Sequence, residues 1–310
     1  MRIQQLAYLD KIVETGSINE AAKQLFLTQP SLSNAIKELE AELGIQLLIR
    51  SKLGVSLTEE GREFMLYARQ ILDQVQLLEE RYQHQPKRKQ NFSVSAQHYA
   101  FVVHAFVELI KSVDANEYQF TLRETETQNI LDDLTQFKSE LGVLYLNDFN
   151  EQVLKKLFKE RDLVFTPLFV AKPHVFVSRN NPLAHQKSVQ LADLADFPYL
   201  SYEQGENNSF YFSEEILSTL HHKKSIKVSD RATIFNLMVG LNGYTISSGI
   251  ISSALNDDKI IAILLEVDDS MTLGWLRHRQ VSLSTTGKKY LQLLKQHIKD
   301  YGFEIMKQET

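Results

Sequence analysis

Hydrogen-bonding side chains whose types and spacing suggest recognition chemistry are concentrated around position 30. Gln29, Ser31, Asn34 and Lys37 alternate with apolar residues of a helical pattern. Gln and Asn can form paired hydrogen bonds with the edge of adenine, while Ser and Lys suit phosphate oxygens or mixed contacts. The chemistry that these residues indicate is binding to the base edges and the backbone of DNA.

Two short helices joined by a tight break are needed to present these groups, and residues 17–43 predict both. Ser17 and Glu20 have the spacing of a capping box at the start of the first helix. Thr28 is a good N-cap for the second helix, whose first turn tolerates Pro30. Such a pair can place its second helix in the major groove of DNA, and the alternative is an ordinary helical hairpin with a solvated face. The residues that give the second helix a buried face are Leu32, Ile36, Leu39 and Leu43.

The segments on both sides of this hairpin favour the DNA-binding interpretation. Residues 3–14 have the pattern of a preceding helix, and residues 47–57 contain two short apolar runs around Gly54, which predicts a β-hairpin, or wing. Arg50 and Lys52 lie on this wing, where they can reach phosphates or the minor groove. The predicted DNA-contacting residues are Gln29, Pro30, Ser31, Ser33, Asn34, Lys37, Arg50 and Lys52.

Residues 1–66 closely resemble the winged helix-turn-helix of LysR-type transcriptional regulators, and the order and spacing of the matching positions fit throughout. Leu48 stands where this family usually has Phe, which is a conservative change in the core. Asn34 stands where Arg is frequent, which bears on the preferred DNA sequence rather than on DNA binding itself. The resemblance implies a ligand-responsive regulator with double-stranded promoter DNA as its partner. The matching residues are 1–6, 14–17, 21–22, 29–33, 36–40, 43–44 and 57–58, together with Gly61.

The composition narrows the class of protein. The chain has 310 residues, which predicts two or three domains, and its hydrophobic fraction of 43% suits a packed globular protein. It has no apolar run of about 18 residues, so we expect no membrane span. No signal-peptide pattern follows Arg2, so we expect a cytoplasmic protein. The sequence has no cysteine, which excludes disulfides, cysteine zinc sites and the peroxide-sensing thiol found in some members of the family that it resembles.

Two other classes of function fit the sequence less well. An enzyme would need a catalytic or nucleotide-binding motif, and the sequence has no G-x-G-x-x-G, P-loop, G-x-S-x-G or H-E-x-x-H pattern. A solute-binding protein for transport would match residues 91–310, but the N-terminal pattern argues against export. We expect no catalysis and no cofactor. We also expect no metal site at His221 and His222, because adjacent side chains point apart.

The charge balance limits how DNA binding can work. Residues 1–90 contain 12 Lys or Arg and 12 Asp or Glu, so this region is neutral, while the whole chain carries a net charge of −5. A strongly basic domain would indicate DNA binding more directly. DNA binding therefore has to depend on the local placement of Lys37, Arg50 and Lys52 and on helix N-termini. Oligomerisation would increase the overall affinity, because several binding units then contact the same DNA.

A single long helix is predicted from Thr58 to about Tyr82, and its apolar residues recur in a heptad-like pattern. The pattern favours a dimer helix, with packing against the chain's own domain as the alternative. The resemblance implies that such helices pair between subunits of a homodimer or homotetramer, which would place two recognition helices about 34 Å apart on DNA. Residues 84–90 read as a hinge, although Lys87, Arg88 and Lys89 could also contact DNA. The predicted dimer residues are Phe64, Ala68, Ile71, Val75, Leu78 and Tyr82.

Beyond Asn91 the pattern changes to alternating strands and helices. Residues 92–146 predict a β-α-β-α-β unit with a parallel sheet, a second unit begins near Val164, and Trp275 is expected in a core. The resemblance implies two α/β effector subdomains, similar to periplasmic binding proteins, with chain crossings near 165 and 268. The predicted class is an α+β multidomain chain. Its expected parts are a winged helix-turn-helix (1–57), a dimerisation linker helix and hinge (58–90), and an effector-binding domain (91–310) with subdomain I (91–165 and 268–310) and subdomain II (166–267).

Polar residues gather where strands end and helices begin in this region, and small ligands collect at such places in open α/β sheets. Helix N-termini near Gln97 and Thr127 could receive an anionic group, and Glu203 could pair with an ammonium, which would suit an amino acid. The alternative for each residue is turn formation, capping or plain hydrogen bonding, and His98 could titrate near neutral pH. The predicted effector-binding residues are Gln97, His98, Tyr99, Thr127, Gln128, Ser201, Tyr202, Glu203 and Ser247.

Residues 92–99 are similar to regulators of methionine and sulfur-amino-acid uptake in Gram-positive bacteria. The resemblance implies an effector related to methionine or cysteine metabolism. The alternative is a regulator of an unrelated metabolic or surface-polysaccharide operon that responds to a different small anionic effector.

Overall fold

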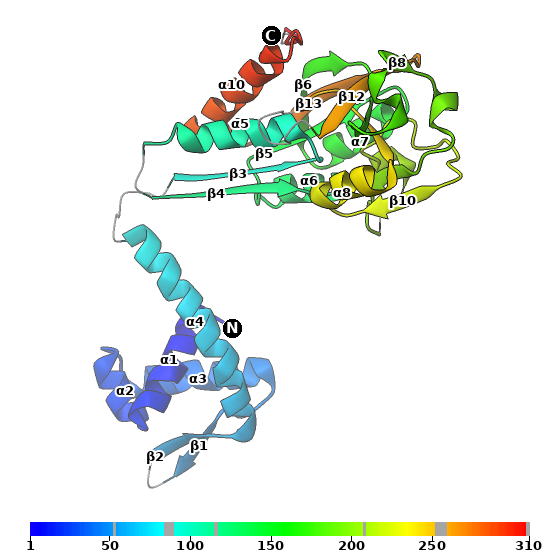
Figure 1. Ribbon diagram of the computed structural model, residues 1–310. Helices are drawn as coiled ribbons and strands as arrows, with labels where there is room; N and C mark the ends of the chain where they lie inside the picture. Colours follow the sequence, from blue (N-terminus) through cyan, green and yellow to red (C-terminus); the bar gives the residue numbers. More distant parts are fainter. Residues whose placement is uncertain (52–53, 84–89, 115–116, 207–208, 252–258, 308–310) are drawn as a thin grey trace. The chain divides into compact units, whose positions relative to one another are not determined.

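The computed structural model describes residues 1–51, 54–83, 90–114, 117–206, 209–251 and 259–307. The chain divides into two compact units, residues 1–88 and residues 89–310 (Figure 1). Within the described ranges, no helix is both long and apolar enough to cross a membrane.

The first unit is a winged helix-turn-helix followed by one long helix, as the sequence predicts. Ser17 caps the second helix by accepting a hydrogen bond from the Glu20 amide, but its own amide donates to Thr15 Oγ1, so the expected capping box forms only in part. Thr28 caps the third helix through the Ser31 amide. The elements are α1 (Ile3–Thr15), α2 (Ile18–Gln24), α3 (Gln29–Leu43), β1 (Leu48–Ser51), β2 (Gly54–Leu57) and α4 (Glu59–Gln83).

The wing is fastened to the helices by specific contacts. Glu40, near the end of α3, accepts hydrogen bonds at Oε1 from the amides of Leu47 at 2.8 Å and Leu48 at 3.1 Å. Gly61 in α4 has to lack a side chain, since a Cβ there would lie 2.2 Å from the Leu47 carbonyl oxygen. This contact gives a physical reason for glycine at position 61, three residues after the α4 cap Thr58, whose Oγ1 accepts from the Gly61 amide.

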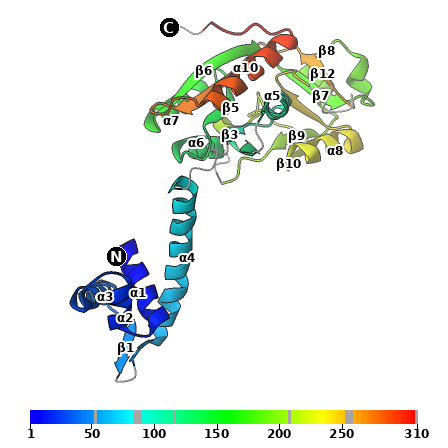
Figure 2. The ribbon, with the colours of Figure 1, turned by 90° about the vertical axis from the view of Figure 1, so that its left-hand side faces the viewer.

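The second unit contains two sheets, which define subdomains I and II. Subdomain I has a five-stranded sheet in the order β4-β3-β5-β13-β6, in which β3 is parallel to β4 and β5, and β13 is antiparallel to β5 and β6. Helices α5 and α10 cover one face of this sheet and α6 the other (Figures 1 and 2). The elements are β3 (Gln90–Ala96), α5 (Ala100–Lys111), β4 (Tyr118–Glu124), α6 (Thr127–Thr135), β5 (Leu141–Leu146), α7 (Glu151–Glu160), β6 (Leu163–Ala171), β13 (Met271–His278) and α10 (Thr285–Asp300).

Subdomain II has a six-stranded sheet in the order β10-β9-β11-β7-β12-β8, against which α8 packs. Helices α7 and α8 and the two-residue strand β8 are not among the elements predicted from the sequence. The elements are β7 (His174–Ser178), β8 (Ser188–Val189), β9 (Tyr199–Tyr202), β10 (Ser225–Val228), α8 (Arg231–Leu241), β11 (Tyr244–Ser247) and β12 (Ile260–Leu265), with 3₁₀ turns at Pro182–His185, Leu191–Leu194 and Phe210–Phe212.

The chain passes between the two sheets twice. It leaves the first sheet after β6 and enters the second at β7, and it returns between β12 and β13. All of β6, including the predicted border at 165–166, belongs to the first sheet. The parallel pairing predicted for residues 92–146 is confirmed, while β6 and β13 add two antiparallel strands that pair closely with each other. Trp275 in β13 is buried in this core, as expected.

Candidate functional site

One face of α3 is buried and the other is open, as DNA recognition requires. The apolar residues Leu32, Ile36 and Leu39 are fully buried in the core of the first unit. The opposite face presents polar side chains, among them an amide, a hydroxyl and an ammonium. The exposed predicted residues of α3 are Gln29, Pro30, Ser31, Asn34 and Lys37.

Ser33 differs from its predicted neighbours because it is buried. Its hydroxyl oxygen accepts a hydrogen bond from Arg50 Nη1 at 3.1 Å, which links α3 to the wing strand β1. The remainder of Arg50 is exposed. This arrangement makes Ser33 a positioning residue for Arg50, while Lys52 lies outside the described residues.

The predicted dimer seam on α4 divides into two parts. Phe64 and Ala68 pack into the core of their own unit, because α4 lies against α1 there. Further along, Ile71 is 40% exposed and Leu78 is 58% exposed. Packing against the chain's own domain therefore accounts for the first part of the pattern. Val75 is half-buried, and the side chain of Tyr82 lies outside the described residues.

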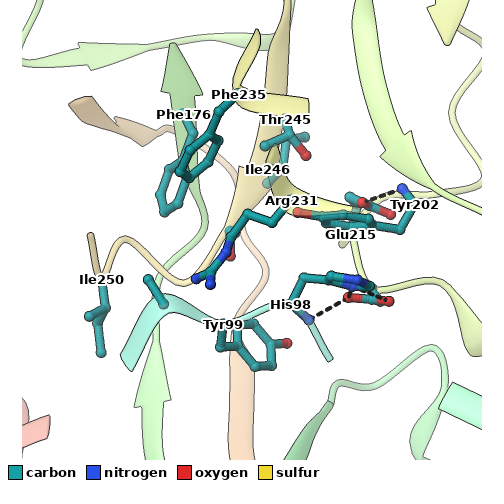
Figure 3. Close-up of a pocket in the computed structure, with 13 residues that line it drawn as sticks. His98, Tyr99, Phe176, Tyr202, Glu215, Arg231, Phe235, Thr245, Ile246 and Ile250 are labelled. Atoms are coloured by element: carbon teal, nitrogen blue, oxygen red, sulfur yellow. Dashed lines mark hydrogen bonds and ion pairs between the residues drawn. The ribbon is translucent and has the colours of Figure 1, made fainter. Parts of the chain in front are cut away.

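A cavity of about 30 Å³ lies between subdomains I and II, at the start of α5. Four predicted effector residues line it: His98, Tyr99, Tyr202 and Ser247. Figure 3 shows Arg231 extending from α8 toward the start of α5, and Phe176 and Phe235 side by side at one wall. The lining residues that the sequence analysis did not select are Ala100, Phe176, Glu214, Glu215, Arg231, Phe235, Thr245, Ile246 and Ile250.

Charged groups of both signs meet around this cavity. Arg231 Nη2 donates to Glu124 Oε2 at 3.1 Å, and the second carboxylate oxygen of Glu124 is buried with no hydrogen-bond partner among the described residues. Burial raises the pKa of the Glu124 carboxyl, although Arg231 acts in the opposite direction. Burial and the nearby charge of Glu214 raise the pKa of Glu215 well above its usual value. Two acidic groups, Glu214 and Glu215, and two basic groups, His98 and Arg231, therefore line the cavity.

His98 stands at the junction of the two subdomains. Its ring stacks on Tyr202 with a centroid distance of 3.9 Å, and its Nδ1 lies 2.9 Å from Glu214 Oε2. Burial would lower the pKa of the imidazole, but the charge and hydrogen bond of Glu214 outweigh burial, so the pKa of His98 is raised. Glu214 therefore favours the cationic form of His98 in this contact.

Gln97 and Thr127 build the framework of the cleft rather than its lining. Gln97 Nε2 donates to Thr127 Oγ1 at 2.7 Å, and Gln97 Oε1 accepts from the Tyr99 hydroxyl at 3.0 Å and from the Tyr145 amide at 3.2 Å. The Thr127 amide donates to Gln204 Oε1 at 3.1 Å. Both side chains are thus occupied inside the protein, which supports the structural alternative considered for them.

The remaining predicted effector residues lie away from the cavity. Gln128 donates to Asp132 within α6, and Glu203 is exposed. Ser201 lines a neighbouring hollow of about 170 Å³, which shares Tyr202 and Glu215 with the cavity. The amides at the starts of α5 and α6, expected to receive an anionic group, already donate to Glu214 and Gln204.

Three charged residues of the cleft were missed from the sequence, although signals for them exist. Arg231 is the first residue of α8, directly after the N-cap Asp230. A helix start that follows a strand is the signal that selected Gln97 and Thr127, and the same signal is present at Arg231. Glu214 and Glu215 are adjacent acids just before the apolar pair Ile216 and Leu217. This pattern hints at burial but does not reveal the partners.

Known protein families match both units. Residues 3–62 match the bacterial regulatory helix-turn-helix proteins of the lysR family, and residues 103–299 match the LysR substrate binding domain. The chain is 26% identical over 294 residues to the uncharacterized HTH-type transcriptional regulator YnfL of Escherichia coli (strain K12), a match that covers 91% of this chain and 94% of YnfL. It is 27% identical over 208 residues to the HTH-type transcriptional regulator CysB of Burkholderia cenocepacia, covering 66% of this chain and 63% of CysB.

A solved structure has the same fold. The structure of the Corynebacterium glutamicum OxyR C206 mutant superposes with a TM-score of 0.56 and 18% sequence identity, over 99% of this chain and 98% of that one. At this identity the likeness concerns the fold alone.

Proposed function

This chain belongs to the LysR family of bacterial transcriptional regulators, and we propose that it controls promoters in response to a small amino-acid-like metabolite. The effector binds between subdomains I and II, next to Arg231. The observation that carries this proposal is the convergence of Arg231, Glu215 and an apolar wall on one cavity.

An amino acid matches this set of groups point by point. Its carboxylate can pair with the guanidinium of Arg231, which suits carboxylates through paired hydrogen bonds. Its ammonium can pair with Glu215, which accepts a hydrogen bond from the Tyr202 amide at 2.9 Å and whose raised pKa a nearby cation would lower again.

The wall of the cavity favours an apolar side chain. Phe176, Phe235 and Ile250 line it, and thioether sulfur makes favourable contacts with aromatic rings. These residues support a methionine- or cysteine-related effector, as the similarity of residues 92–99 implies. A different small anion held by Arg231 alone, in a regulator of an unrelated operon, is the competing assignment that the experiment below distinguishes.

DNA binding is proposed to depend on α3 and the wing. Gln29, Asn34 and Lys37 are exposed on α3, and Arg50, one residue before the end of β1, is held by a hydrogen bond to Ser33. The exposed apolar residues of α4, Ile71 and Leu78, support pairing of this helix with a second copy in the cytoplasm, where promoters are bound. A two-fold dimer would read an interrupted palindrome.

Two measurements on the full chain test this proposal. Genomic fragments bound by the purified protein are sequenced, and enrichment of interrupted palindromes upstream of sulfur-amino-acid genes is expected. The protein is then titrated calorimetrically with the L-amino acids and simple anions. We expect binding of a sulfur-containing amino acid that Arg231→Gln weakens at least tenfold.

The matched control is Arg161→Gln, which removes an arginine from another ion pair, with Asp132, away from the cavity. Binding of a simple anion without an ammonium would replace the amino-acid assignment by the competing one. Enrichment upstream of other genes would retain the regulator and remove the link to sulfur metabolism.

A further inference from the structure

The carboxylate of Glu214 lies at the residue just before the N-cap of α5, beside the cavity. It accepts a hydrogen bond from the His98 amide at 2.8 Å, lies 2.9 Å from His98 Nδ1, and accepts from Gln204 Nε2 at 3.3 Å. Glu214 comes from subdomain II, is 116 residues away from His98 in sequence, and is buried. An anion at a helix start is stabilised by free amides and by the helix dipole.

The segment that carries Glu214 is attached to subdomain I at several further points. Residues 209–215, which we call the strap, contain a 3₁₀ turn at Phe210–Phe212. The Phe212 carbonyl accepts from Thr127 Oγ1 at 2.7 Å, and the ring of Tyr211 stacks on Phe149 with a centroid distance of 4.7 Å. Phe212 also packs against the apolar cluster beneath α6. The strap therefore belongs to subdomain II by sequence but lies on subdomain I.

The space left beside the strap is too small for an amino acid. The cavity measures about 30 Å³. One ordered water needs roughly 10–15 Å³ on this kind of measure, so the cavity has room for about two waters. A ligand that binds next to Arg231 has to enlarge the cavity, and Glu214 of the strap is one of the two groups packed directly against His98, the other being Tyr202.

We propose that Glu214 is an internal occupant of the effector's carboxylate position, and that the effector binds by displacing this carboxylate from the His98 amide and releasing the strap from subdomain I. This inference rests on the proposed function for the class of effector. The ligand carboxylate takes over the hydrogen bond of the His98 amide next to Arg231. Glu214 thus acts as a competitor within the chain, which sets the effector concentration needed for a response.

The test compares the full-length wild type with Glu214→Ala and Glu214→Gln. Glu206→Ala, which removes an exposed acid before the strap, is the matched control. Hydrogen exchange of the His98 amide and of the amides in 209–215 is measured without any ligand. We expect both to exchange at least tenfold faster in Glu214→Ala, and to change little in the control.

A carboxylate probe then tests the vacated position directly. Sodium acetate is titrated while the His98 amide resonance is followed by NMR, and we expect saturable shifts in Glu214→Ala but none in the wild type. L-methionine is expected to bind Glu214→Ala about 10- to 100-fold more tightly than wild type, the range that corresponds to one charge-assisted hydrogen bond. Glu214→Gln keeps a hydrogen-bond acceptor at this position, so it disturbs folding less than Glu214→Ala. We expect its affinity for L-methionine to lie between those of the wild type and Glu214→Ala.

The outcomes separate this inference from the proposed function. If exchange in 209–215 is unchanged and acetate has no effect in Glu214→Ala, the strap is not an internal competitor, whatever the effector is. If Glu214→Ala weakens L-methionine binding, Glu214 contacts the effector and displacement is wrong. If acetate binds the variant as expected but no amino acid binds either protein, the displacement stands and the proposed effector class fails.

Discussion

The ion pair between Arg231 and Glu124 makes a prediction that can be worked out from the structure. The two side chains retain 18% and 21% of their exposure, and their closest atoms are 3.1 Å apart. Removing one partner of a fully buried pair costs about 3–5 kcal/mol, because the other charge remains without a counter-charge. Partial exposure reduces this figure, so we expect Arg231→Gln to lower the free energy of unfolding of the second unit by about 2 kcal/mol.

The size of the effect is limited by protonation of Glu124. Burial already raises the pKa of this carboxyl, and Arg231 opposes burial more strongly than His98, the other group that lowers the pKa. Without Arg231 the carboxyl takes up a proton more readily, so the cost of the substitution should be larger at pH 8 than at pH 6. Adding Glu124→Gln removes the unpaired charge, and the double variant should recover about 1 kcal/mol relative to Arg231→Gln alone.

Trp275 provides the assay. It is the only tryptophan in the 310 residues and lies buried in β13 of the second unit, so urea unfolding followed by its fluorescence reports on that unit. A cost below about 0.5 kcal/mol for Arg231→Gln, the size of an ordinary surface substitution, would refute the reasoning. Simple addition of the two single effects in the double variant would refute it as well, since it would mean that the pair does not interact.

Two further predictions concern pH and salt. The pKa of His98 is raised in the folded chain. Its contribution to stability is therefore complete below the unfolded pKa of about 6.5 and is lost as pH rises through the folded pKa. In unfolding experiments at pH 6, 7 and 8, His98→Gln should flatten this decline in stability. An unchanged slope in His98→Gln would rule out this histidine as its source. Lys37→Ala should weaken DNA binding and reduce the slope of log affinity against log salt by about 1 per subunit, whereas Lys111→Ala in α5 should leave the slope unchanged. Equal slopes for Lys37→Ala and wild type would mean that Lys37 contacts no phosphate.

The winged unit was predictable because its signals are local. Thr28, Pro30 and the apolar spacing of α3 lie within one helix, and each acts on its immediate neighbours. The buried position of Ser33 was not predictable in this way, since its partner Arg50 is 17 residues away on another element. Periodicity also could not show whether Phe64 and Ala68 pack in their own unit or against a second copy. A helix that packs against α1 and a helix that packs against a partner helix have the same heptad pattern.

The effector cleft was predictable in its location but not in its contents. Strand ends and helix starts identified His98, Tyr99, Tyr202 and Ser247 around one cavity. The same rule selected Gln97 and Thr127, whose side chains form buried hydrogen bonds that a single sequence does not reveal. Whether the amide at a helix start is free for a ligand depends on distant residues such as Glu214, which the local pattern around His98 cannot indicate.

Glu214 and Glu215 are neighbours in sequence, but their carboxylates accept hydrogen bonds from backbone amides of different subdomains. Glu214 holds the His98 amide of subdomain I, and Glu215 holds the Tyr202 amide of subdomain II. A ligand that replaces Glu214 removes this hydrogen bond to subdomain I and leaves that of Glu215 to subdomain II in place, so the contacts of Phe212 and Tyr211 are what still hold the strap on subdomain I. A ligand shifts a conformational equilibrium only by its difference in affinity for the two states. If the effector displaces Glu214, this difference depends on how much more strongly the effector's carboxylate binds at the His98 amide than the carboxylate of Glu214 does. Substitutions at position 214 should therefore change the effector concentration needed for a response without altering the DNA-binding unit.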